Sequence, residues 1–186
     1  MAAGPAVGPP DRCRYPRRVR WWIALGVVLA ACGGAGPVAP APGSPDVACT
    51  ERFCVTYPSD WSALVGDGFV SFTHPTDPDR VLGTASETNM EGVVRNAGGT
   101  WPASVEVAAA SFWALLEEAG VAELATVERL AGGSVASFGA YQDGRLWTLL
   151  IPVDSTVAVG IEVRAPNRTW QSHVDVFFSD VVVFSG

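Results

Sequence analysis

Four cysteines are the side chains of this chain most able to carry out chemistry. Cys13 and Cys32 lie in the N-terminal stretch, and Cys49 and Cys54 lie five positions apart further along. A thiol can carry a lipid, bind a metal, form a disulfide or act as a nucleophile, and its surroundings decide which of these it does. The chemistry expected at each cysteine therefore depends on the segments around it.

Cys32 stands where an export signal would end. Five arginines within residues 12–20 precede an apolar run at 21–31, which is the pattern of a secretory signal peptide. The run is about half the length needed to cross a bilayer, so we do not expect a permanent transmembrane span. Leu29-Ala30-Ala31-Cys32 resembles the bacterial lipobox. The resemblance implies that residues 1–31 are removed and that Cys32, the new N-terminus, carries diacylglycerol.

Ordinary secretion is the alternative, with a cut after Ala39-Pro40-Ala41. That cut lies far beyond the apolar run and is followed by Pro42, which a protease accepts poorly. Arg17-Arg18 also fits twin-arginine export, but an Arg pair is common in any basic signal region.

The chain after the leader is strongly acidic. Residues 32–186 hold seven arginines against 18 acids and no lysine, a formal charge of −11. This charge argues against nucleic acid as a partner, because too few cations are available to replace phosphate counterions. It also repels anionic lipid headgroups, so acyl chains on Cys32 would hold the protein at the membrane. The lack of lysine and the abundance of Ala, Gly, Val and Pro favour a high-GC organism such as an actinobacterium.

Residues 32–47 are expected to form a tether. They are rich in Pro, Gly and Ala, and repeated proline favours an extended polyproline II conformation. The same stretch contains two PxxP spacings, at 37–40 and 42–45, so a proline-rich recognition motif is the alternative.

Cys49 and Cys54 are an even pair in an exported chain, which predicts a disulfide. A redox-active pair would have C-x-x-C spacing in front of a βαβ unit, whereas here the spacing is C-x4-C. A zinc site would need further ligands, and no histidine is nearby.

Few other side chains are arranged in a pattern that could carry out chemistry. We therefore predict no catalytic residues, no metal and no cofactor. His74 beside Pro75 is expected in a solvated turn, and His173 on a helix surface. Asp77-Pro78-Asp79 lacks the glycine and distal glutamate of a calcium loop. Nucleophile elbows and phosphate-binding loops are missing from the sequence. A carboxylate pair such as Glu87 with Glu91 leaves glycoside hydrolysis open.

Hydrophobic periodicity predicts an α+β domain at residues 48–186. Alternating runs predict strands at 53–57, 68–73, 81–88, 124–130, 134–142, 145–151 and 157–164. Helical spacing predicts helices at 102–118 and from Trp170 to Val181. Asp143-Gly144 between two runs is a strong hairpin signal, and such short connections favour an antiparallel sheet with helices packed on it.

Two segments carry a resemblance to a known family. Residues 54–61, CVTYPSDW, followed by 69–72, FVSF, resemble the opening of PsbP-like domains, a fold shared by actinobacterial lipoproteins of the LpqN type. The chain's end, an Arg-x-Trp leading into a helix with paired phenylalanines, is similar as well. The resemblance implies the fold and an accessory or binding role, and supplies no site residues.

Five tryptophans remain after the leader. Trp113 and Trp170 fall on apolar helix faces and are core candidates, whereas Trp61 and Trp101 lie near turns. Core or edge packing is favoured for these two over stacking on a ligand.

These observations predict a lipoprotein on the extracytoplasmic side of the cell membrane that acts as a non-catalytic binding or assembly module. Its partner would be an unidentified envelope protein. The alternatives are an envelope hydrolase with paired carboxylates, and a carrier that binds a small apolar ligand between sheet and helices.

Overall fold

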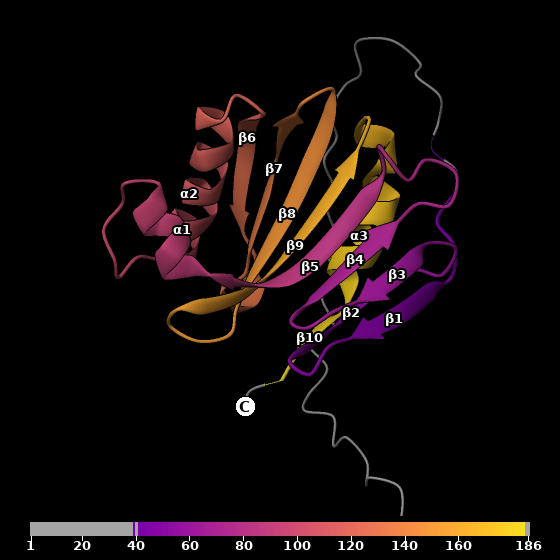
Figure 1. Cartoon of the computed structure of the whole chain (residues 1–186), viewed down its shortest axis with the longest axis horizontal. Coiled ribbons are helices and arrows are strands. Elements are labelled where there is room, and N and C mark those ends of the chain that lie inside the picture. Colours follow the sequence, from indigo (N-terminus) through magenta and orange to yellow (C-terminus); the bar gives the residue numbers. More distant parts are fainter. Residues whose placement is uncertain (1–38, 40, 185–186) are drawn as a thin grey trace, which may run out of the picture.

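The computed structural model describes residues 39 and 41–184. It is a layered α+β domain built on a large antiparallel sheet, with helices on both sides (Figure 1). The predicted signal peptide, Cys32 and most of the predicted tether lie outside the described residues. Within the described part of the chain, no helix is long and apolar enough to cross a bilayer.

The secondary-structure elements follow the order β1–β5, α1, α2, β6–β9, α3, β10, with two short 3₁₀ turns. The strands are β1 Pro45–Cys49, β2 Phe53–Pro58, β3 Ser62–Val65, β4 Phe69–Thr73, β5 Leu82–Asn89, β6 Ala122–Arg129, β7 Val135–Tyr141, β8 Gly144–Pro152, β9 Val157–Ala165 and β10 Val181–Val183. The helices are α1 Met90–Asn96, α2 Val105–Glu118 and α3 Gln171–Ser179, and the 3₁₀ turns are Ala131–Gly133 and Arg168–Trp170.

Seven strands form the central sheet in the order β3-β4-β5-β9-β8-β7-β6, and every neighbouring pair is antiparallel. The β7–β8 hairpin forms where it was predicted, but its two turn residues are Gln142 and Asp143, one position earlier than expected, because Gly144 is already paired with Tyr141 as the first residue of β8. Gln142 takes the positive φ of the turn. Strand β9 lies between β5 and β8, although β5 precedes it by some seventy residues. The α1–α2 and β6–β8 segments are therefore inserted between two strands that pair with each other.

The main core fills the side of the sheet that faces α3 and the small sheet β1-β2-β10. Strand β9 directs Val159, Ile161 and Val163 toward it, and α3 contributes Val174 and Phe177. Phe53 and Val55 of β2 enter from the small sheet. All of these side chains are 1% exposed or less.

A smaller apolar cluster lies on the opposite side of the sheet, beneath α1 and α2. Its buried members are Met90, Val94, Ala108 and Ala158, with Leu150 packed against them. Residues of β9 thus alternate between the two sides, as the period of a strand requires. The cluster is small because α2 packs mainly on β6 and β7 at one edge of the sheet.

Cys49 and Cys54 face each other across the β1–β2 turn, with sulfur atoms 2.05 Å apart. Strand β1 starts at Pro45, so the folded domain includes the last residues of the segment expected to be tether. The hairpin explains this, since each residue from Pro45 to Cys49 has a partner in β2.

Four elements are absent from the sequence-based prediction, namely β1, β3, α1 and β10. Strand β3 is exposed at all four positions, so it has no alternating pattern to detect. Helix α1 has only seven residues. The second predicted helix ends at Ser179, earlier than expected, because Asp180 is extended and Val181–Val183 pair with β2 as β10.

Candidate ligand-binding site

A cleft of about 150 Å³ opens between the α1–α2 layer and the central sheet. Its walls are mostly apolar, with a few polar groups contributed by the sheet. The lining residues are Thr88, Met90, Val93, Ala108, Ala109, Phe112, Thr148, Leu149, Leu150, Gly160, Ile161 and Glu162. Apolar walls with few polar groups are typical of small-molecule sites.

Small residues keep this cleft open. Ala108 and Ala109 of α2 face the sheet with short side chains. Gly160 lies on the floor, where a Cβ atom would come within 2.7 Å of the Thr88 hydroxyl. Larger side chains at these places would fill the space that the cleft occupies.

Helix α1 forms one wall and is held at its N-terminus. The Asn89 side chain accepts a hydrogen bond from the Gly92 amide at 3.0 Å, which caps the helix. The Met90 amide also donates to the carbonyl of Thr156 at 2.8 Å. Met90 and Val93, which line the cleft, are therefore fixed relative to the β8–β9 turn.

Glu162 is the one carboxylate among the lining residues. In the sheet its direct neighbours are Thr84 on β5 and Thr148 on β8, so three polar side chains form a row across adjacent strands. The nearest cation is Arg164, whose Nη2 lies 3.7 Å from Oε2 of Glu162. Burial raises the pKa of Glu162, and Arg164 lowers it by less.

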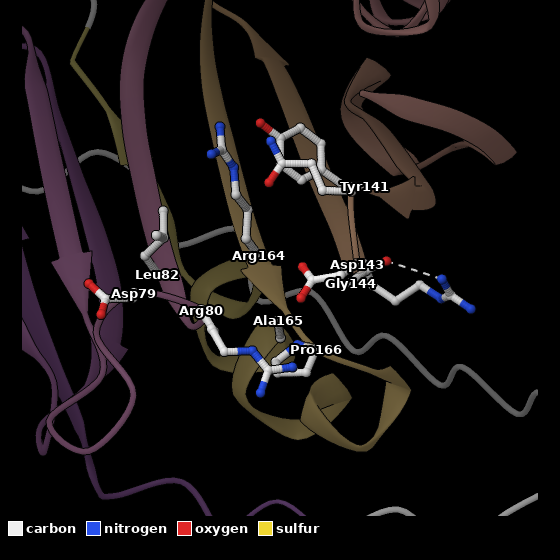
Figure 2. Close-up of a pocket in the computed structure, with 11 residues that line it drawn as sticks. Asp79, Arg80, Leu82, Tyr141, Asp143, Gly144, Arg164, Ala165 and Pro166 are labelled. Carbon is white, nitrogen blue, oxygen red and sulfur yellow. Dashed lines mark hydrogen bonds between the residues drawn. The ribbon is translucent and has the colours of Figure 1, made fainter. Parts of the chain in front are cut away.

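A second, smaller pocket of about 80 Å³ lies beyond Arg164, at the β7–β8 hairpin. Arg80, Arg145 and Arg164 line it, which suggests an anion site at first sight. Figure 2 shows, however, that the Arg80 and Arg164 guanidinium groups point away from each other. Arg145 donates to the carbonyl oxygen of Gly144. The cations do not converge on a common point.

The predicted positions of the two histidines are wrong. His74 and His173 are buried, 3% and 1% exposed, rather than solvated. Their ring centroids lie 6.1 Å apart, and the Trp61 and Trp170 rings pack against both. The physical reason is that the His74 loop folds against the first turn of α3, so two positions distant in sequence share one aromatic cluster.

The histidine cluster lacks the composition of a metal site. Within residues 39 and 41–184, no group of three or more His, Cys, Asp or Glu side chains is placed to hold an ion. Burial lowers the pKa of His173, the neighbouring His74 lowers it further, and Asp60 raises it. His74 Nδ1 lies 3.2 Å from the Thr76 hydroxyl. The surroundings of His173 therefore favour its neutral imidazole.

The carboxylates considered for hydrolysis do not line the cleft. Glu91 pairs with Arg95 at 2.7 Å within α1, and Glu87 lies 3.6 Å from Arg52. Trp61 is buried, and Trp101 is half-buried against the small cluster. Sequence reasoning did not single out Glu162. A charged residue inside an otherwise apolar strand, GIEV, was the available signal.

Comparison with known proteins identifies the fold. No protein-family model and no curated protein matches the sequence. The solution structure of cyanobacterial PsbP (CyanoP) from Synechocystis is similar, with a TM-score of 0.51 over 82% of this chain and 98% of that one, at 16% identity. The chain has a PsbP-like fold.

A crystal structure from Bacteroides thetaiotaomicron also aligns with the PsbP-like domain. Its TM-score is 0.40 at 14% identity, over 77% of this chain and 49% of that one. At such identities the similarity concerns the fold alone, so the function must be argued from the site.

Proposed function

We propose that this PsbP-like domain is a non-catalytic binding protein of the cell envelope, held at the extracytoplasmic membrane surface by lipid on Cys32. The cleft beneath α1 and α2 is the observation that carries the proposal, because it offers an apolar binding volume with a few polar groups. Among the functions considered from the sequence, the cleft favours a carrier of a small ligand.

The size of the cleft limits its ligand. Drug-sized ligands occupy roughly 300–1,000 Å³, whereas this volume is about 150 Å³. An apolar cavity near 150 Å³ is large enough for a benzene ring. The ligand is therefore a small molecule, or the apolar end of a larger one.

The composition of the cleft argues against the hydrolase alternative. Glycoside hydrolysis with two carboxylates needs both of them flanking the bond, about 5 to 10 Å apart. Glu162 is the only acid among the residues that line the cleft, and Glu87 and Glu91 are engaged with arginines.

A binding assay with matched variants tests the proposal. The Cys32→Ser protein, which cannot carry the lipid, would be titrated calorimetrically with 2-phenylethanol as a neutral ring probe. Ala109→Leu fills the cleft, and we expect it to weaken binding by about tenfold, since ligand and side chain compete for one volume. Ala110→Leu places the same change at the next, exposed position of α2 and should leave binding unchanged.

The results of this assay would decide between the proposal and its alternatives. Failure of the probe to bind, or equal weakening by the two variants, would overturn the cleft as the binding site. Val93→Phe is a second filling variant, to be used if Ala109→Leu impairs folding as judged by circular dichroism. If the wild type hydrolysed an envelope glycan and the Glu162→Gln variant did not, the protein would be an enzyme and the proposal would be wrong.

A further inference from the structure

Glu162 and Arg164 present opposite charges on the cleft side of β9. They are two positions apart on one strand, so their side chains leave the sheet on the same side. Glu162 pairs across the sheet with Thr84 and Thr148, and Arg164 with Leu82 and Leu146. The acid lines the apolar cleft, and the cation follows directly beyond it.

The two charges are only loosely paired. Their closest atoms are 3.7 Å apart, which is longer than the 2.7–2.9 Å of a charge-assisted hydrogen bond. Arg164 Nε is buried without an acceptor in the described part of the chain. Both side chains nevertheless remain about one-third exposed. Each side chain therefore keeps exposed surface that a small molecule can contact, although the buried Nε of Arg164 is not part of that surface.

Arg164 is held in place by an aromatic ring. Its guanidinium carbon lies 4.4 Å from the centroid of Tyr141, which is within cation–π range, and Figure 2 shows the two side chains next to each other. Stacking restrains the plane of the guanidinium but leaves its in-plane N–H donors free for a carboxylate. The ring therefore orients Arg164 without consuming its donors.

Electrostatics at Glu162 favour an added cation. Burial raises the pKa of this carboxyl, and Arg164 offsets the effect only in part. A ligand ammonium beside the carboxylate would supply the missing stabilisation. Because Arg164 stands next to it, a ligand with a positive charge alone would meet repulsion, whereas one that also carries a carboxylate would complement both groups.

We propose that Glu162 and Arg164 bind the ammonium and carboxylate groups of an α-amino acid whose apolar side chain enters the cleft. This inference rests on the proposed function and specifies its ligand class. A side chain the size of a benzyl or isobutyl group matches the volume of about 150 Å³.

Four compounds that share one phenyl group test the inference on the Cys32→Ser protein. They are phenylalanine, the cation phenethylamine, the anion 3-phenylpropanoate and the neutral 2-phenylethanol. We expect phenylalanine to bind about tenfold more tightly than each of the others, since only the zwitterion engages both charged side chains. Binding would be measured by calorimetry at low ionic strength.

Two variants that remove one charge each locate the contacts. Glu162→Gln and Arg164→Gln should each weaken the binding of phenylalanine by about tenfold. Both should leave the affinity for 2-phenylethanol unchanged. Glu128→Gln and Arg95→Gln make the same changes at exposed sites away from the cleft and should have no effect.

The results distinguish this inference from the function on which it rests. Equal affinity for the four compounds, or tightest binding of phenethylamine or 3-phenylpropanoate, would overturn the zwitterion site while the cleft stands. Absence of binding by all four would overturn the cleft as well. A loss of phenylalanine binding in Glu128→Gln or Arg95→Gln equal to that in the cleft variants would also refute the assignment, because it would reflect net charge.

Discussion

His173 is a titratable side chain in an apolar setting. It is 1% exposed and lies against Trp61, Trp170 and His74. Burial and the neighbouring His74 lower its pKa, and Asp60 only partly opposes them. Protonation of His173 should therefore be tied to the stability of the fold.

The stability of the domain is expected to fall as pH decreases below about 6.5, the ordinary pKa of histidine in an unfolded chain. Between that value and the lower folded pKa, the unfolded state binds more protons, so acid favours unfolding. Stability is fully present above this window. Urea unfolding of the wild type and His173→Gln from pH 8 to pH 5 measures the effect.

The difference between the two proteins isolates His173, because Glu162 titrates in both. The raised pKa of Glu162 acts in the opposite direction and cancels in the comparison. If the two proteins lost stability in parallel between pH 7 and pH 5, the assignment to His173 would be wrong.

Gly139 of β7 is a position where a methyl group has no room. An added Cβ would overlap the carbonyl oxygen of Glu123 and lie 2.6 Å from the Trp113 ring, which is fully buried. We expect Gly139→Ala to reduce the free energy of unfolding by about 1–3 kcal/mol, the usual cost of overpacking, as measured by urea denaturation.

Ser137 on the same strand supplies the control. Its hydroxyl is buried without a partner among the described residues, so Ser137→Ala should be neutral or slightly stabilising. Destabilisation of the two variants by equal amounts would show that β7 tolerates no change, rather than that Gly139 is specifically required.

At the scale of elements, the β1–β2 hairpin joins the start of the domain to the main core. Phe53 and Val55 of β2 are fully buried, whereas β1 is exposed at four of its five positions. Strand β1 is therefore retained mainly by its ladder with β2 and by the contact of Cys49 with Cys54.

Loss of this disulfide is expected to lower the free energy of unfolding by about 2 kcal/mol, because the ring that it closes is small. Urea unfolding of the wild type and Cys49→Ser/Cys54→Ser measures the change. Non-reducing mass spectrometry of protein taken from the envelope should show the linked peptides two hydrogens lighter. Two alkylatable thiols there would refute the bond.

The stability of helix α1 depends on its N-terminal cap, because the helix is short. Isolated helices of seven residues are unstable in water, and Asn89 satisfies one of the free amides at the N-terminus. Asn89→Ala should cost about 1 kcal/mol, while Asn89→Ser, which retains a capping oxygen, should cost less. Chemical denaturation compares the two, and equal losses would indicate that the cap contributes nothing.

At the scale of the whole molecule, we expect membrane attachment to depend on the proposed anchor and not on the acidic domain. The charge of −11 on residues 32–186 is expected to repel anionic membranes, so attachment should depend on acyl chains, of which two or more are needed for stable binding. Cys32→Ser is expected to move the protein from the membrane fraction to the soluble fraction on cell fractionation. Unchanged membrane association would contradict lipidation at Cys32.

The sequence alone specified those features that local patterns encode. Alternation in 145–151 and 157–164 predicted β8 and β9, because a half-buried strand repeats every two residues. Asp143-Gly144 predicted the hairpin, although the turn itself is formed by Gln142 and Asp143, with Gly144 paired in β8. The pairing of Cys49 with Cys54 was predicted because they are the two cysteines that remain in an exported chain.

Tertiary structure decided which of these elements became neighbours. Periodicity shows which side of its own strand Glu162 occupies, but not that β5 and β8 flank β9 and place Thr84 and Thr148 beside it. Burial of His74 against His173 likewise depends on a loop meeting a helix across 99 positions. The cleft exists because α2 packs toward one edge of the sheet. That position results from the packing of all the apolar faces of the chain against one another. A pattern within one segment of the sequence therefore could not predict it.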